Sequence, residues 1–186
     1  SETKTFGVYT SQSPSVSQSP SVNPSLSQSP SLSQLPSLSL SPSQYCFEDS
    51  VEDEFRAGEL FDAVKKYIGQ GCATNPSCEV RQQYGDIGSW CTSKITNMYG
   101  LFYNASSFNE PLNGWDLSSV TTTSAMFVDA SSFNQPLNGW NVEAVTDMSF
   151  MFYGASQFNQ PLNGWSTGNV VAMYGMFYYT PSFNQE

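Results

Sequence analysis

The second half of the chain repeats its hydrophobic pattern every 25 residues. One tryptophan, two phenylalanines and one aliphatic residue return in register in each unit. The equivalent sets are Trp90, Trp115, Trp140 and Trp165; Phe102, Phe127, Phe152 and Phe177; Phe108, Phe133, Phe158 and Phe183; and Ile95, Val120, Val145 and Val170. Because one such unit cannot bury its aromatic side chains alone, neighbouring units must stack. The pattern predicts a repeat solenoid of 25-residue coils over residues 90–186.

Within one unit, the spacing of the apolar residues changes from two to three or four. Trp140 and Val142 alternate as in a short strand, whereas the apolar positions from Val145 to Phe152 have the spacing of a short helix. Asn138-Gly139 tolerates positive φ where the chain turns into the strand. Each coil is therefore expected to contain a short parallel β-strand and a short helical turn.

An asparagine also recurs once in each unit, directly after a phenylalanine. The equivalent residues are Asn109, Asn134, Asn159 and Asn184. Buried peptide groups must be paired, so we expect an internal ladder in which these side chains bond to the backbone. The alternative interpretation is a row of ligand-binding side chains on one face of the solenoid.

Residues 46–89 are predicted to form a helical cap on the N-terminal end of the solenoid. A helix is expected over 49–68, because Asp49 has the character of an N-cap and Lys65 and Lys66 lie in the last turn before Gly69. The apolar positions of this helix form one stripe, which suits the covering of an exposed coil.

The four cysteines lie in or beside this cap, and none has the spacing of a zinc ribbon or a redox motif. Three pairings are possible for Cys46, Cys72, Cys78 and Cys91. We favour Cys72 with Cys78, which closes a short loop, and Cys46 with Cys91. The alternative is a set of buried free thiols in a reducing compartment.

The N-terminal arm has a period of two, with serine at nearly every odd position from Ser11 to Ser43. Its regularly spaced prolines exclude a helix and favour an extended or polyproline II backbone over residues 11–45. Residues 1–10 form a β-prone stretch with Phe6 and Val8 on one face, suited to addition as a strand to another subunit. The composition alone would equally fit a mucin-like stalk.

Covalent glycans are expected at two places. Asn104-Ala105-Ser106 is an N-glycosylation acceptor, with an unmodified loop asparagine as the alternative. The arm offers many further sites on serine or modified proline. The arm candidates are Ser13, Ser19, Ser29, Ser41, Pro14, Pro20, Pro30 and Pro42.

Charge and composition exclude several classes of function. The chain has 16 acidic and six basic residues, and no Lys or Arg follows Lys94, so nucleic acid is not an expected partner. No apolar run is long enough to span a bilayer, and the start at Ser1 without Met is typical of a mature, secreted chain, so membrane insertion is not expected. Without histidine, we expect no enzyme, metal or cofactor.

A rival interpretation is a carbohydrate-active enzyme that uses scattered acids. The candidates are Asp116, Asp129, Glu143 and Asp147. Most of them do not recur at equivalent positions of the repeat. Glycoside hydrolysis usually needs two carboxylates held together in a cleft, and no such cleft is expected here.

The repeat pattern W-x-x-S-x-V-T-x-M-x-x-M-F-x-x-A-x-x-F-N resembles the 25-residue repeat of BspA-like surface proteins and mycoplasma lipoproteins over residues 84–186. The segments Glu59–Val64 and Tyr84–Trp90 are similar to the element that precedes the first repeat in that family. The resemblance implies a leucine-rich-repeat-like solenoid on cell surfaces, with adhesion or recognition as its role and no catalytic motif.

Taken with the arm, these features predict an extracellular structural protein that forms a filament or surface coat from copies of itself. The repeat stops at Asn184-Gln185-Glu186 without a polar cap, so Trp165, Phe177 and Phe183 are expected at an assembly surface. Head-to-tail stacking and exchange of arms would then join the subunits. The alternative is a cell-surface adhesin whose solenoid face binds protein or glycan.

Overall fold

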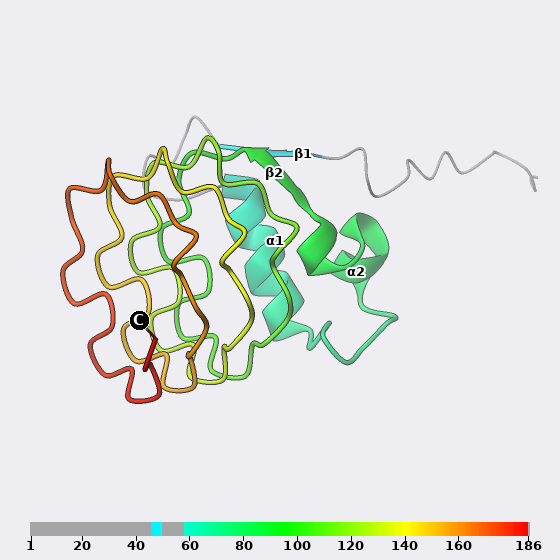
Figure 1. Cartoon of the computed structure of the whole chain (residues 1–186). Helices are drawn as coiled ribbons and strands as arrows, with labels where there is room; N and C mark the ends of the chain where they lie inside the picture. Colours follow the sequence, from blue (N-terminus) through cyan, green and yellow to red (C-terminus); the bar gives the residue numbers. More distant parts are fainter. Residues whose placement is uncertain (1–45, 50–57, 186) are drawn as a thin grey trace, which may run out of the picture. The chain divides into compact units, whose positions relative to one another are not determined.

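The computed structural model describes residues 46–49 and 58–185 (Figure 1). The expectations for the N-terminal strand (1–10) and for the arm (11–45) fall outside these residues. All of the described residues belong to one compact unit, which lies within Leu38–Glu186.

The regular elements of the described residues lie in the cap and at its junction with the repeats. They are β1 (Cys46–Glu48), α1 (Gly58–Gly69), α2 (Glu79–Tyr84), the 3-10 helix η2 (Ile87–Ser89) and β2 (Cys91–Lys94). β1 and β2 pair in parallel, with Cys46 opposite Cys91 and Glu48 opposite Lys94. No helix in this part of the chain is long and apolar enough to cross a bilayer.

Helix α1 is amphipathic and packs its apolar side on the first coil. Leu60, Ala63, Val64 and Tyr67 recur at the spacing of one helical face and are all buried. Glu59 in the first turn and Lys66 in the last turn complement the helix dipole. The helix predicted over 49–68 thus has its described part at 58–69, and residues 50–57 lie outside the described residues.

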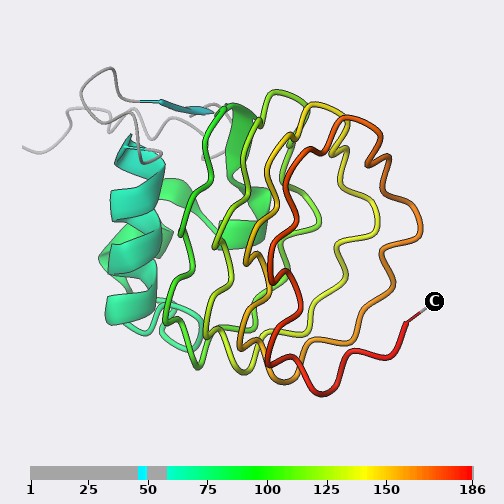
Figure 2. The ribbon, with the colours of Figure 1, turned by 90° about the vertical axis from the view of Figure 1, so that its left-hand side faces the viewer.

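Successive 25-residue units lie one on another, and their backbones are joined at one fixed segment (Figure 2). Parallel bridges connect Asn97 to Thr122, Thr122 to Asp147, and Asp147 to Ala172. After each bridge, every second N–H donates to a carbonyl of the following coil. In the first coil the donors are Met98, Gly100, Phe102 and Asn104, at 2.8 to 3.1 Å from Thr122, Ser124, Met126 and Val128.

The strand and the helix expected in each coil are not present where the spacing placed them. Trp140 and Val142 lie in an irregular segment, and the bridge forms instead at Asp147. Residues 148–154 form consecutive turns rather than a helix. The reason is that alternate N–H groups bond to the next coil and the others close turns, such as Met151 N–H to the Met148 carbonyl at 3.2 Å. The spacing of three and four comes from these turns.

Two positions of each coil hold the left-handed backbone that these turns require. One position is occupied by Gly100, Ala125, Phe150 and Gly175, and the other by Asn104, Asp129, Gly154 and Tyr179, all with φ between 55° and 69°. Left-handed backbone costs a non-glycine residue about 1 kcal/mol or more. The stacking bonds outweigh this cost at Ala125 and Phe150.

The core consists of aromatic columns that run from coil to coil. Phe102, Phe127, Phe152 and Phe177 stack at centroid distances of 5.1, 5.5 and 5.6 Å. The second phenylalanine column, from Phe108 to Phe183, has a regular spacing of 6.0 Å. Trp115, Trp140 and Trp165 also donate the indole N–H to a carbonyl 28 residues earlier, as Trp140 does to the Leu112 carbonyl at 3.0 Å. These contacts fix the register of the coils.

Candidate functional site

The N-terminal end of the stack is closed by polar contacts from the cap. Lys65 of α1 donates to the Tyr103 carbonyl at 3.2 Å. The Asp49 carboxylate accepts from the N–H and the hydroxyl of Thr96 at 2.8 and 2.6 Å. Helix α1 also exposes Glu59, Asp62 and Lys66. The charged and hydrogen-bonded cap therefore occupies the position where a preceding coil would stack.

Two disulfides hold this cap in place. Cys46 is bonded to Cys91 and joins β1 to β2, and Cys72 is bonded to Cys78 and closes the loop between α1 and α2. This is the pairing that the sequence favours, and the described residues contain no free cysteine. Such bonds persist in an oxidising compartment.

The opposite end differs, because the fourth coil presents backbone donors that have no partner in the described residues. Its N–H groups at Met173, Gly175, Phe177 and Tyr179 are equivalent to those that join each earlier coil to the next. The described backbone bonds use none of these four groups as donors. Unpaired peptide groups on a regular edge are a template for an added strand.

The same coil exposes apolar surface. Trp165, Phe177 and Phe183, the predicted assembly residues, lie together around a hollow of about 250 Å³. They are only partly exposed, because each still packs against the ring column below it, as Trp165 does on Trp140 at 6.5 Å. The more exposed apolar residues are Val171, at 85%, and Tyr174, at 74%.

The recurring asparagines form the predicted bonds to the backbone, but the ladder is not internal, since Asn109 and Asn184 are exposed and Asn134 and Asn159 are half-buried. The Oδ1 atom of Asn109 accepts from the Asn134 N–H at 2.9 Å, and the same bond joins Asn134 to Asn159 and Asn159 to Asn184. A glutamine of the next coil adds a second bond at each step, as Gln160 does to Asn134 Oδ1 at 3.0 Å. These side-chain oxygens are engaged between coils, which argues against a ligand-binding row.

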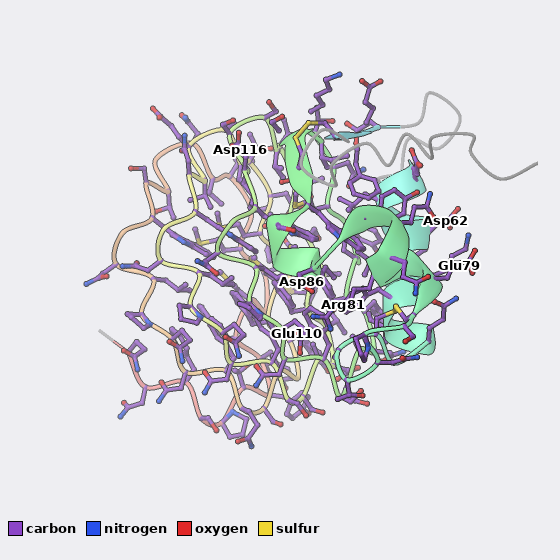
Figure 3. All side chains as sticks on the ribbon, turned by 90° about the vertical axis from the view of Figure 1, so that its right-hand side faces the viewer. Asp62, Glu79, Arg81, Asp86, Glu110 and Asp116 are labelled. Carbon is purple, nitrogen blue, oxygen red and sulfur yellow. A yellow bond between two sulfur atoms is a disulfide. The ribbon has the colours of Figure 1, made fainter. Side chains whose placement is uncertain are left out.

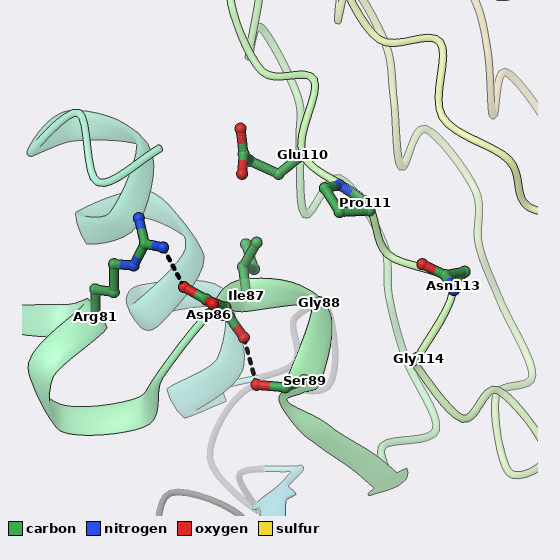
Figure 4. A pocket seen from close by; sticks show the side chains of 9 residues that line it. All are labelled: Arg81, Asp86, Ile87, Gly88, Ser89, Glu110, Pro111, Asn113 and Gly114. Atoms are coloured by element: carbon green, nitrogen blue, oxygen red, sulfur yellow. Dashed lines mark hydrogen bonds and ion pairs between the residues drawn. The ribbon is translucent and has the colours of Figure 1, made fainter. Parts of the chain in front are cut away.

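A charged hollow of about 370 Å³ lies between η2 and the loop that ends the first coil (Figure 4). Arg81, Asp86 and Glu110 line it, together with Gly88 and other backbone. Arg81 forms an ion pair with Asp86 and donates to the Cys72 carbonyl at 3.2 Å. Asp86 and Glu110 thus line the same hollow.

The structure gives these carboxylates no arrangement that identifies chemistry. Asp86 is held by Arg81, and no group of three or more cysteine or acidic side chains in the described residues is placed to hold a metal ion. Burial raises the pKa of the neighbouring Tyr67, and the negative charge of Glu110 raises it further. Figure 3 shows acids of the cap and of the first coil on this side of the molecule.

The acids of the rival enzymatic interpretation are scattered, and two of them have structural roles. Asp116 Oδ1 accepts from the Ser118 N–H at 2.9 Å, and this bond lowers the pKa of Asp116. Asp147 Oδ1 accepts in the same way from the Ser149 N–H at 2.8 Å. Both contacts stabilise tight turns. Asp129 and Glu143 are exposed, in other parts of the repeat.

The expected glycosylation sites are described only in part. Asn104 is exposed, and its left-handed backbone, with φ of 59°, places it in a turn of the first coil. An exposed turn suits an N-linked glycan. The arm candidates Ser13 to Pro42, and the strand residues Phe6 and Val8, lie outside the described residues.

A comparison with protein families shows to which family the chain is related. Residues 75–186, more than half of its length, match the family described as Mycoplasma protein of unknown function, DUF285. The chain belongs to the DUF285 family. The match begins at Asn75, within the loop that Cys72 and Cys78 close, so the DUF285 region contains α2, η2 and β2 as well as the coils. No curated protein and no solved structure matches the chain.

Proposed function

We propose that this DUF285 protein is an extracellular structural protein, the subunit of a glycosylated filament or surface coat. Its body is a BspA-like, leucine-rich-repeat-like solenoid. The observation that carries the proposal is the row of N–H groups on the fourth coil, at Met173, Gly175, Phe177 and Tyr179, beside exposed apolar side chains. Such an edge accepts a further extended chain.

Direct stacking of one body on the next is the weaker route to assembly. Helix α1 covers the first coil, and Lys65 already occupies the Tyr103 carbonyl. A second copy would have to displace this charged helix before its first coil met the open edge. We therefore assign the β-prone stretch around Phe6 and Val8, on its sequence, to the open edge of a neighbouring copy.

An extracellular location agrees with the two disulfides, because reducing compartments do not maintain such bonds. It also agrees with the exposed acceptor Asn104. Glycosylation there is tested by mass spectrometry of the natural protein before and after treatment with a peptide N-glycosidase. A loss of glycan mass at Asn104 supports the proposal, and an unmodified Asn104 contradicts it.

The experiment for assembly is electron microscopy of the full chain and its variants. Met173→Glu places a charge on the open edge, and Phe6→Asp with Val8→Asp does so on the proposed donor strand; both should abolish filaments. Tyr99→Glu is the matched control, since Tyr99 and Met173 are 46% and 45% exposed. Single particles of the wild type, or filaments of both edge and strand variants, would overturn the proposal.

Mass spectrometry of the natural protein gives a second test. A chain that continues beyond Glu186 with another repeat would pair the same N–H row within one molecule. The proposal then fails, even if filaments form by another route. A mature chain that ends near residue 186 leaves the row for a neighbour.

A further inference from the structure

Seven aromatic residues gather on the bridged face of the coils, in a patch that we name the aromatic stripe. The stripe contains Tyr99, Tyr103, Phe150, Tyr153, Tyr174, Tyr178 and Tyr179. All of them belong to the turn segment that follows a bridge, so the stacking of the coils places them on one face. Five of the six tyrosines are 46% to 74% exposed, which is unusual for residues of this size.

Four rings of the stripe, those of Phe150, Tyr153, Tyr178 and Tyr179, contact each other. Tyr153 stacks on Tyr178 with a centroid distance of 5.6 Å and meets Tyr179 edge-to-face at 5.6 Å. Phe150 meets Tyr153 edge-to-face at 6.1 Å. Tyr99 and Tyr103, in the first coil, flank a groove of about 580 Å³ beside Phe61 and Lys65.

The polar groups of the stripe are almost all hydroxyls. The repeat position of Tyr99 carries an exposed tyrosine again in the fourth coil, Tyr174, whereas Ser124 and Ser149 at this position are buried. No Lys or Arg occurs after Lys94, and the exposed carboxylate of Asp129 lies at the repeat position of Tyr179. Lys65 borders the stripe only at the groove beside Tyr99 and Tyr103, so charge complementarity disfavours an anionic partner along the later coils. A purely apolar partner would leave the phenol hydroxyls without hydrogen bonds.

We propose that the aromatic stripe binds a neutral oligosaccharide chain supplied by another surface. The faces of pyranose rings would stack on the tyrosine rings, and their hydroxyls would bond to the phenol hydroxyls. A tyrosine side chain has an apolar ring face and a solvated hydroxyl at its edge. A pyranose likewise has an apolar face and hydroxyl groups at its edge, so the two surfaces match. The aromatic residues of the stripe lie in the first, third and fourth coils, and the three coil steps from Tyr99 to Tyr174 extend over about 14 Å, a distance that several sugar units cover. This activity goes beyond the proposed assembly.

The repeat itself supplies substitutions that the fold tolerates. Tyr174→Ser introduces the residue that stands at the equivalent positions 124 and 149, and Tyr178→Val introduces the residue at position 128. The matched control is Val171→Thr, because Val171 is 85% exposed on the same coil and its equivalents are Thr121 and Thr146. Tyr174→Phe with Tyr178→Phe separates the contribution of the hydroxyls from that of the rings.

Binding is measured by isothermal titration of the full chain with cellohexaose, mannohexaose and N-acetylchitohexaose, with hexagalacturonate as the anionic probe. We expect at least one neutral hexasaccharide to bind with Kd of about 10⁻⁵ to 10⁻³ M, within the range of weak specific complexes. The Ser/Val double variant should weaken it at least tenfold, and the Phe double variant should weaken it less. Val171→Thr should leave it unchanged.

Absence of binding to all three neutral probes, equal binding by the double variant, or preference for hexagalacturonate would overturn the inference. So would self-association through the stripe, seen as a change in sedimentation of the double variant without sugar binding. The stripe substitutions avoid Met173, Phe6 and Val8. Because Tyr174 lies on the coil of the open edge, the Ser/Val double variant is also imaged by electron microscopy, and loss of sugar binding with filaments retained separates this inference from the proposed assembly.

Discussion

The carboxylate of Asp49 takes the place of a missing coil beneath Thr96. It accepts the N–H and the hydroxyl of Thr96 at 2.8 and 2.6 Å. The equivalent threonine of the next coil, Thr121, directs the same two donors to the Thr96 carbonyl at 2.7 and 3.1 Å. One side chain of the cap, that of Asp49, thus supplies to Thr96 the acceptor that a preceding coil supplies to Thr121.

Removal of this carboxylate should destabilise the cap. We expect Asp49→Ala to lower the free energy of unfolding by about 1–3 kcal/mol, because two donors lose a charged acceptor. Urea unfolding followed by tryptophan fluorescence measures the change. Asp62→Ala, an exposed acid on α1, is the control and should stay within about 0.5 kcal/mol of the wild type. Equal effects of the two substitutions would remove the special role of Asp49.

The two disulfides should differ in their contribution to stability. Cys46–Cys91 spans 45 residues and Cys72–Cys78 spans six. The entropy of loop closure gives about 4 kcal/mol for the first and about 2 kcal/mol for the second. Paired cysteine-to-serine variants, compared by urea unfolding, test the order. A larger loss from the short loop would contradict it.

Two glycines at the same repeat position should respond in opposite ways to alanine. A Cβ at Gly164 would lie 2.7 Å from the Asn138 carbonyl oxygen, whereas a Cβ at Gly139 meets nothing within 4 Å. Gly164→Ala should destabilise the protein by about 1–3 kcal/mol through steric overlap. Gly139→Ala should be neutral or stabilising by about 0.4–1 kcal/mol, because it restricts the unfolded chain. Thermal unfolding of both variants distinguishes them, and similar shifts would refute the contact.

Stability should decline in alkaline solution because of two tyrosines of the cap. Burial raises the pKa of Tyr67, and burial with a hydrogen bond to Glu59 raises the pKa of Tyr84. A pKa raised in the folded state gives stability that is complete below the unfolded value of about 10 and is lost as pH rises above it. Tyr67→Phe with Tyr84→Phe should flatten this decline in unfolding measured from pH 8 to 11. An unchanged slope would exclude these groups as the cause.

The sequence predicted those features that depend on the identity of side chains. The 25-residue register located the phenylalanine columns, and the asparagine after each Phe predicted a ladder that the hydrogen bonds confirm. Residues 25 positions apart occupy the same place in successive coils, so each position of the repeat has one structural environment.

Features that depend on backbone geometry were missed. Gly100 and Gly175 suggest a left-handed position, but Ala125 and Phe150 at the same position conceal it. The short helix was a wrong prediction, because apolar spacing does not reveal whether an N–H bonds within a coil or to the next one. The tyrosine pattern of Tyr103, Tyr153 and Tyr178 did carry a readable signal, since these residues are separated by multiples of the repeat.

The hydrogen bonds between coils also align the peptide dipoles of the bridged segment. In the segment from Met98 to Asn104, the bonded N–H groups point toward the following coil, and the carbonyls that receive them point back. Peptide dipoles aligned in this way add, as they do along a helix. The carbonyl pole lies at the first coil, where the ammonium group of Lys65 sits on the Tyr103 oxygen. The N–H groups of the bridged segments point from there toward the fourth coil, so the backbone alone gives the described coils a direction from negative to positive.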